Sequence, residues 1–188
     1  MGDPARRRAN YEDVLAAPEH LIAEVIAGTL YTQARPRSRH ARSASRLGDV
    51  LGGPFDRGSG GPGGWLILDE PELHLGLDPD IVVPDLAGWR RERMPEMPDV
   101  AYFTLAQDWA CEVLSPSTED VDRAEKVPVY AREGVGHLWL VDPLLRTLEV
   151  LRLDGGTYRL ISTVRGEACV RAEPFEALEL ELALLWAR

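Results

Sequence analysis

The sequence predicts a mixed fold, α/β or α+β, around one β-sheet, and three features carry this prediction. Short strand-like apolar segments recur along the chain, and two helical segments, at residues 38–51 and 117–132, interrupt them. The segment DWACEVL at residues 108–114 is apolar on both faces, which is typical of a central strand covered on each side. A chain of 188 residues, 45% of them hydrophobic, is long enough to bury one core. We therefore expect a flexible arm at residues 1–10 and a single domain at residues 11–188.

The first half of the chain is expected to hold two helices and two groups of strands. YEDVLAAP is typical of a short helix that ends at Pro18, and HLIAEVIAGTLYTQ is typical of two strands that place Glu24 in the first. These strands should turn at Ala27 and Gly28. The Gly-rich residues 52–64 lack the spaced lysine of a phosphate loop, so they predict a flexible connection. Further strands are expected at residues 65–70, 72–76 and 80–85.

The second half is expected to hold one helix between strands. Ser117 or Thr118 offers an N-cap, and Gly134 would close the helix that starts there. Pro128 lies inside it and removes one helical hydrogen bond, which predicts a kink or a late start near Asp122. The remaining strands are expected at residues 108–114, 137–142, 147–153, 158–164 and 178–182.

Composition and charge exclude some classes of protein. The net charge of −10 counts against a protein that coats nucleic acid without specificity, because such binding depends on neutralised phosphates. No apolar run approaches the roughly 18 residues of a membrane span, and the N-terminus lacks the apolar segment of a secretion signal. We therefore expect a cytoplasmic protein that does not enter membranes. Cys111 and Cys169 lie in apolar strand-like runs without metal-ligand spacing, which predicts buried, reduced thiols.

One segment is basic, although the chain as a whole carries a net negative charge. RPRSRHARSASR, residues 35–46, holds five arginines and no acid. Read as part of a helix, it places Arg39, Arg42 and Arg46 on one outer stripe. This stripe is either a solvated helix face or a surface that contacts nucleic-acid phosphates.

The only lysine among the 21 basic residues is Lys126, and this isolation points to chemistry. Unlike arginine, lysine offers a compact ammonium whose pKa moves readily on burial. Glu112 presents a related problem, because a polar group on a strand that is apolar on both faces costs about 2–7 kcal/mol unless it is satisfied. Lys126 and a divalent metal ion are the two candidates for the cation that Glu112 requires.

Asp85 is a second carboxylate with an unusual position. It follows an apolar strand segment and Pro84, which cannot donate a ladder hydrogen bond, so the aspartate should lie at the margin of a sheet. Ligand sites gather where strand ends meet. Two carboxylates about 4 Å apart repel by roughly 4 kcal/mol at an effective dielectric of about 20, so convergence of Asp85 with Glu112 would call for a hard cation such as Mg²⁺.

These residues form a pattern with a family resemblance. Pro84 and Asp85, then EVLSPST from Glu112, the D…K…Y spacing, and GVGHLWLVDP from Gly134 together resemble the Uma-type family of restriction-endonuclease-like proteins. That family belongs to the PD-(D/E)XK nuclease superfamily. EVIAGTL and His40 at the head of the following helix also resemble the family. The resemblance covers about residues 11–186.

The resemblance implies a restriction-endonuclease-like core, in which a mixed central β-sheet is flanked by helices and accompanied by additional β-hairpins. It implies that Asp85 and Glu112 hold Mg²⁺, with Mn²⁺ as a substitute, and that Glu24 is a third site carboxylate. Asp122, His40 and Tyr130 would support the site. The superfamily's strand lysine is Leu114 here, and Lys126 on the next helix would replace it. A further departure is Ala27, where the family usually carries an acid.

The function implied is Mg²⁺-dependent hydrolysis of phosphodiester bonds in nucleic acid, with DNA as the expected partner. Catalysis would fall to Asp85, Glu112, Lys126 and Glu24, and a homodimer follows by analogy with duplex-cutting relatives. Two alternatives stay open: a nuclease-fold protein that binds without cutting, and a small-molecule phosphohydrolase. For Glu112 and Lys126 alone, a purely structural ion pair is the competing interpretation.

Overall fold

The computed structural model describes residues 7–186 and contains a six-stranded sheet, a four-stranded sheet and a two-stranded ribbon. The six-stranded sheet has the order β10-β9-β8-β7-β6-β3. Its β7 and β8 are parallel and all its other pairs are antiparallel, so the expected mixed sheet is present. Its strands are β3 (Trp65–Asp69), β6 (Leu86–Arg90), β7 (Trp109–Val113), β8 (His137–Asp142), β9 (Thr147–Asp154) and β10 (Thr157–Arg165).

The four-stranded sheet comes from the first half of the chain, and the two-stranded ribbon comes from its C-terminal part. The four-stranded sheet has the order β2-β1-β5-β4, with β1 (Leu21–Ile26), β2 (Thr29–Ala34), β4 (Leu73–Leu75) and β5 (Asp80–Val82). β1 and β2 form the predicted hairpin, and its turn residues Ala27 and Gly28 have φ values of 51° and 76°. β11 (Cys169–Val170) pairs with β12 (Leu180–Glu181), ahead of the 3₁₀ turn η3 (Leu182–Leu185).

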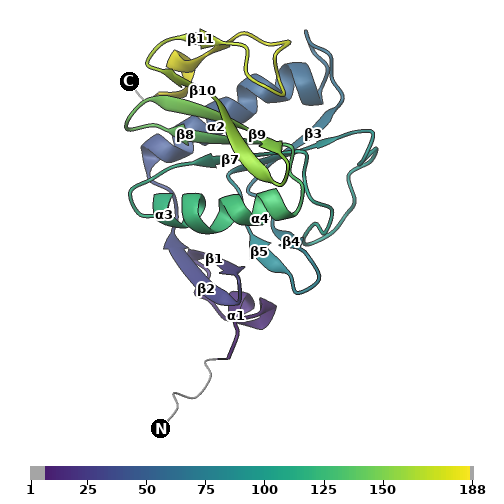
Figure 1. The fold of residues 1–188 in the computed structure, drawn as a ribbon, viewed down its shortest axis with the longest axis vertical. Helices are drawn as coiled ribbons and strands as arrows, with labels where there is room; N and C mark the ends of the chain where they lie inside the picture. The colour runs from purple at the N-terminus through teal and green to yellow at the C-terminus, as the bar shows by residue number, and fades with distance from the viewer. Residues whose placement is uncertain (1–6, 187–188) are drawn as a thin grey trace.

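Two helical segments pack on opposite faces of the six-stranded sheet (Figure 1). α2 (Ser38–Leu51) has the predicted bounds, and its Leu47 and Leu51 are fully buried on one face. On the other face lies a continuous helical segment formed by α3 (Glu119–Val121), η2 (Asp122–Lys126) and α4 (Val127–Arg132). A short N-terminal helix, α1 (Tyr11–Leu15), is capped by Asn10.

Side chains along β7 alternate between the two faces of the sheet, and this alternation determines the face on which Glu112 lies. Trp109, Cys111 and Val113 pack in the core that contains α2, whereas Ala110 packs in the core that contains α4. Side chains alternate between faces along a strand, so Glu112 shares the α4 face with Ala110. All five residues of β7 are buried, which confirms a central strand covered on both sides.

Pro128 disturbs the helix, but not through the predicted kink or late start near Asp122. The helix begins at Glu119 after Thr118, and it widens to π-helical hydrogen bonding over η2, directly ahead of Pro128. The amide of Val127 donates to the carbonyl of Asp122, five residues back. Because Pro128 has no amide hydrogen, the wider turn replaces the sharp kink or the late start.

Three details differ from the expectations. β6 was not predicted, because LAGWR is short and carries a central glycine. The Gly-rich connection starts with one π-helical turn, η1 (Gly52–Asp56), because the side chain of Phe55 is buried in the core. Cys169 is exposed, which corrects the expectation that both thiols are buried; Cys111 is buried, and both are free.

Part of the predicted N-terminal arm is held against the domain. Residues 1–6 lie outside the described residues. The amide of Ala9 donates to the carbonyl of Gly28 over 2.8 Å, and Arg8 pairs with Asp78 at 2.9 Å. Among residues 7–186, no helix has both the length and the apolar character to cross a membrane.

Gly88 supplies a test of the packing within the six-stranded sheet. It lies at the centre of β6, and a Cβ atom there would lie 3.2 Å from ring atoms of both Trp109 and Trp65, which are buried. We expect Gly88→Val to lower the free energy of unfolding by about 1–3 kcal/mol, because the rings cannot separate without strain. Urea unfolding measures this, with Gly53→Ala as a control whose nearest neighbour is the flexible end of Arg57. Equal stabilities of the two variants would contradict the packing argument.

Candidate functional site

A pocket of about 570 Å³ opens where the two larger sheets meet the helix that starts after Thr118. Its floor contains Asp85, Glu112, Asp122 and Lys126. The chain leaves the four-stranded sheet after β5 and enters the six-stranded sheet at β6, and Asp85 lies between them. This confirms the sheet-margin position that Pro84 predicts.

Lys126 lies at the centre of three carboxylates. Its Nζ is 3.0 Å from Oε1 of Glu24, 3.2 Å from Oδ1 of Asp122 and 3.3 Å from Oε2 of Glu112. It also donates to the carbonyl of Val83 at 3.4 Å. Burial lowers the pKa of this ammonium, but the carboxylates outweigh burial and hold it well above the usual value. Asp122 is the i,i+4 partner that the helical spacing predicts.

Glu112 has a second partner on the same helix. The hydroxyl of Tyr130 donates to its Oε1 over 2.6 Å, and both side chains are buried. Burial raises the pKa of Glu112 well above its ordinary value, and the carboxylates of Asp122 and Asp85 add to the effect while Lys126 opposes it. The structure therefore places Tyr130, which was predicted to support the site, beside Glu112.

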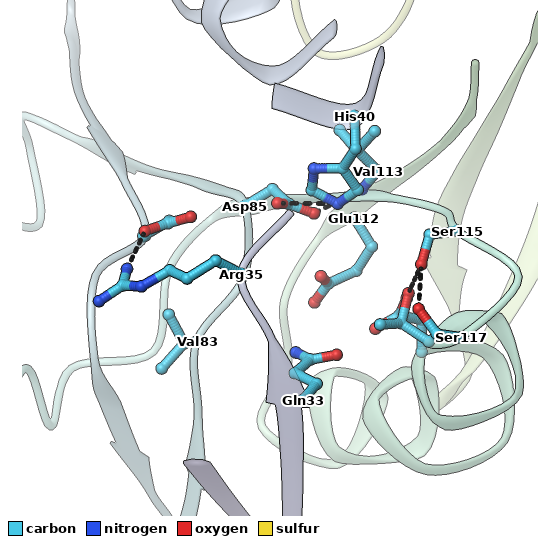
Figure 2. Close-up of polar contacts among 12 residues, drawn as sticks. Gln33, Arg35, His40, Val83, Asp85, Glu112, Val113, Ser115 and Ser117 are labelled. Atoms are coloured by element: carbon cyan, nitrogen blue, oxygen red, sulfur yellow. Dashed lines mark hydrogen bonds and ion pairs between the residues drawn. The ribbon is translucent and has the colours of Figure 1, made fainter. Parts of the chain in front are cut away.

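Asp85 is held by a strand and by α2. Its Oδ2 accepts the Val113 amide hydrogen at 2.7 Å, and Nε2 of His40 lies 3.3 Å from its Oδ1. Burial lowers the pKa of His40, but the contact with Asp85 outweighs it, and the net pKa is raised. Nδ1 of His40 is buried and has no hydrogen-bond partner among residues 7–186. Figure 2 shows Asp85 and Glu112 near each other, with His40 beside Asp85.

Glu24 reaches the site from β1. Its Oε1 accepts the Val83 amide hydrogen at 2.8 Å, and its Oε2 accepts from Nε2 of Gln33 at 3.3 Å. The residue is 1% exposed, so Glu24 is not an ordinary exposed strand residue. Together with Lys126, these bonds tie the first hairpin to the connection between the sheets.

The site carries more negative than positive groups. Four carboxylates, those of Glu24, Asp85, Glu112 and Asp122, face one ammonium and the imidazole of His40. Within residues 7–186, no three His, Cys, Asp or Glu side chains are arranged to hold a metal ion by themselves. The hard oxygens of Asp85 and Glu112 still fit Mg²⁺, which commonly takes one or two carboxylates together with water and substrate phosphate oxygens.

The three arginines expected on one stripe, Arg39, Arg42 and Arg46, lie at two different surfaces. Arg39 lines the pocket, together with Arg35 and Arg37 from the β2–α2 connection. Arg42 and Arg46 line a different hollow, beside Leu184 and Trp186. Nη1 of Arg46 lies 3.4 Å from Oδ2 of Asp49.

Two contributions could not be expected from the sequence. Val83 acts through its backbone amide and carbonyl, which side-chain patterns do not reveal. Gln33 reaches Glu24 from the partner strand of the hairpin. Ser115, Ser117 and Thr118 also line the pocket. The sequence could have indicated these three residues as part of the site, because they belong to the EVLSPST block.

Replacing Tyr130 tests the charge on Glu112. Tyr130→Phe should lower the free energy of unfolding by about 1.5–3 kcal/mol, because it removes a buried hydrogen bond to a charged group. Tyr158→Phe is the matched control, since that hydroxyl donates to the neutral carbonyl of Val135 and should cost about 0.5–1.5 kcal/mol. Urea unfolding at pH 8 compares them. Equal costs would indicate that Glu112 is uncharged in the folded protein.

Comparison with known proteins agrees with the geometry. A crystal structure described as "a putative nuclease belonging to DUF820 from Anabaena variabilis" superposes with a TM-score of 0.74 at 22% identity, over 93% of this chain and 95% of that one. At this identity the likeness concerns the fold. A search of curated proteins finds no match. The Uma2 family model, described as "Putative restriction endonuclease", matches residues 9–184, so the chain belongs to the Uma2 family.

Proposed function

We propose that this protein is a divalent-metal-dependent phosphodiesterase that hydrolyses nucleic acid, with DNA as its main substrate. The observation that carries the proposal is the convergence of Asp85, Glu112 and Lys126 in one pocket, from a sheet junction, a central strand and a helix. The family description, "Putative restriction endonuclease", supports the same reaction class. At the floor of the pocket, the carboxylates outnumber the ammonium and the imidazole, and this excess supports a requirement for a further cation.

Asp85 and Glu112 are the residues that would hold Mg²⁺ or Mn²⁺. Such an ion, when bound, supplies Lewis acidity toward a phosphoryl oxygen and lowers the pKa of its bound water. His40 and the amide of Val113 hold the carboxylate of Asp85 in place. Tyr130 does the same for Glu112. These partners fix the orientation of both carboxylates before substrate arrives.

Lys126 would stabilise the negative charge that grows on the phosphoryl group. It occupies the role of the superfamily's strand lysine, whose position here is Leu114, and it reaches Glu112 from the neighbouring helix. Glu24 and Asp122 keep the Lys126 ammonium charged and hold it at the floor of the pocket. Since its own position is set by three carboxylates, the ammonium needs little reorganisation during the reaction.

A second candidate is a nuclease-fold protein that binds nucleic acid without cutting it. The observation in its favour is the enclosure of Lys126, whose side chain is 2% exposed and whose Nζ contacts four oxygen atoms. In that case the cluster would be a structural ion-pair network.

A metal-binding experiment tests the site directly. Crystals soaked in Mn²⁺ should show anomalous density between Asp85 and Glu112, because both carry hard oxygen donors at the floor of the pocket. Asp85→Asn should remove the density, whereas Asp49→Asn, an exposed acid on α2, should leave it unchanged. No density in the parent protein at saturating Mn²⁺ would contradict the metal site.

Lys126→Arg tests the catalytic role of the ammonium. The change keeps the charge, but a guanidinium cannot match the three carboxylates that surround Nζ, so the variant should fold with a lowered melting temperature. The planar guanidinium cannot take the same position, and DNA cleavage with Mg²⁺ should fall at least about 100-fold. Arg132→Lys, an exchange on the same helical segment at an exposed position, should cleave at the parental rate.

Two outcomes would oppose this assignment. A Lys126→Arg variant that cuts as fast as the parent would show that Lys126 does not replace the motif lysine. A parent protein that cuts no DNA or RNA with Mg²⁺ or Mn²⁺ would favour the second candidate.

A further inference from the structure

We propose that the pocket admits one nucleotide of an unpaired strand, so that the preferred substrate is single-stranded or locally unpaired nucleic acid. This inference rests on the proposed function and specifies its substrate class. It follows from the depth of the reactive groups, from the size of the pocket and from the chemistry of its walls.

The reactive groups lie deep. The side chains of Lys126, Glu112 and Glu24 are each 2% exposed, and that of Asp85 is 13% exposed. A scissile phosphate must therefore enter the pocket to reach them. Phosphates at the outer surface of an intact helix do not meet this requirement unless the walls move.

The pocket is too small for a duplex. Its volume of about 570 Å³ lies within the range of pockets that bury a molecule of roughly drug size, which is also the size of a nucleotide. The major groove of B-DNA alone is about 12 Å wide, and the persistence length of the duplex is about 150 base pairs, so bending a short duplex into the pocket is costly. An unpaired strand has no such stiffness, and enzymes that act on a base likewise take single strands or extrude one nucleotide into a pocket.

One wall of the pocket suits phosphates. Arg35, Arg37 and Arg39 line it, and no acidic residue occurs between residues 33 and 48. The guanidinium of Arg35 lies 3.8 Å from Glu70, and the Arg35 side chain is 63% exposed, so it is accessible to an anion. In Figure 2, Arg35 and Ser115 lie on opposite sides of Glu112, so a strand over the floor would run between the two walls.

The other wall suits a sugar and a base. Leu114 and Pro116 line it after β7, and Pro143 and Leu144 line it from the β8–β9 turn. Leu144 is 53% exposed, so its apolar surface is available to a ligand. In a continuous duplex the base faces are stacked and cannot contact such a wall, whereas the faces of an unpaired nucleotide are free.

Binding measurements without cleavage test the inference. A fluorescein-labelled 12-nucleotide DNA strand and its matched duplex are titrated with the protein in Ca²⁺, and fluorescence anisotropy is recorded. We expect at least about tenfold tighter binding of the single strand. Leu144→Asp should weaken that binding about tenfold, and Leu145→Asp, at a 74% exposed neighbour outside the pocket, should not.

A second pair of variants tests the basic wall. Arg39→Ala should reduce the slope of log K against log salt for the single strand by about 0.7, the value for one phosphate contact. Arg42→Ala is the matched control, because Arg42 lies on the same helix but outside the pocket. Equal slopes for the two variants would remove the basic wall from the substrate path.

The outcomes separate this inference from the proposed function. Duplex binding as tight as single-strand binding, or equal effects of Leu144→Asp and Leu145→Asp, would overturn the inference even if duplex DNA is cut. A clear single-strand preference without cleavage in Mg²⁺ or Mn²⁺ would support the inference and overturn the catalytic proposal. Binding of a free deoxynucleoside monophosphate, measured by isothermal titration calorimetry, without binding of the labelled strand would overturn the inference in favour of a small-molecule phosphohydrolase.

Discussion

The contact between the Lys126 ammonium and the carboxylates of Glu24, Glu112 and Asp122 is the interaction on which the site depends. It joins the first hairpin, the central strand and the helix. A compact ammonium can donate in three directions at once, whereas the planar fork of arginine cannot match three separate acceptors in this way. Loss of the ammonium would leave buried carboxylates without a cation, a change that typically costs about 3–5 kcal/mol. This explains why one lysine occurs in a chain whose other basic residues are arginines.

Burial on both faces of β7 makes this contact possible. The alternation of the strand turns Cys111 and Val113 toward α2 and turns Glu112 toward Tyr130 and Lys126. The parallel neighbour β8 places the apolar Leu140 opposite Glu112, and the carboxylate accepts hydrogen bonds from Lys126 and Tyr130 of the helical segment. A low local dielectric strengthens each of these bonds and also makes any unpaired charge costly. The site is therefore rigid because its members are buried.

The balance of charge carries a cost in stability that the proposed function would explain. Four carboxylates with one ammonium and one imidazole are not the arrangement that stability alone would favour, because like charges meet in a buried place. Sites that bind cations and anionic substrates commonly give up stability in this way. The π-helical turn η2 adds to this pattern, since such turns are frequent at functional sites and this one carries both Asp122 and Lys126.

The sequence by itself determined the local elements and the chemical identity of the main candidates. The bounds of α2, the first hairpin, the central strand and the irregular helix before Pro128 all follow from patterns within a few residues. Glu112 and Lys126 were recognisable because a carboxylate in an apolar strand and a solitary lysine are locally unusual. The tertiary structure alone decided that Val83 and Gln33 hold Glu24 in place, that β6 separates β3 from β7, and that the arginine stripe divides between two surfaces. These features depend on backbone groups and on contacts between segments far apart in the chain, such as Glu24 and Lys126, 102 residues apart, which only the packing of the two sheets and the helix brings together.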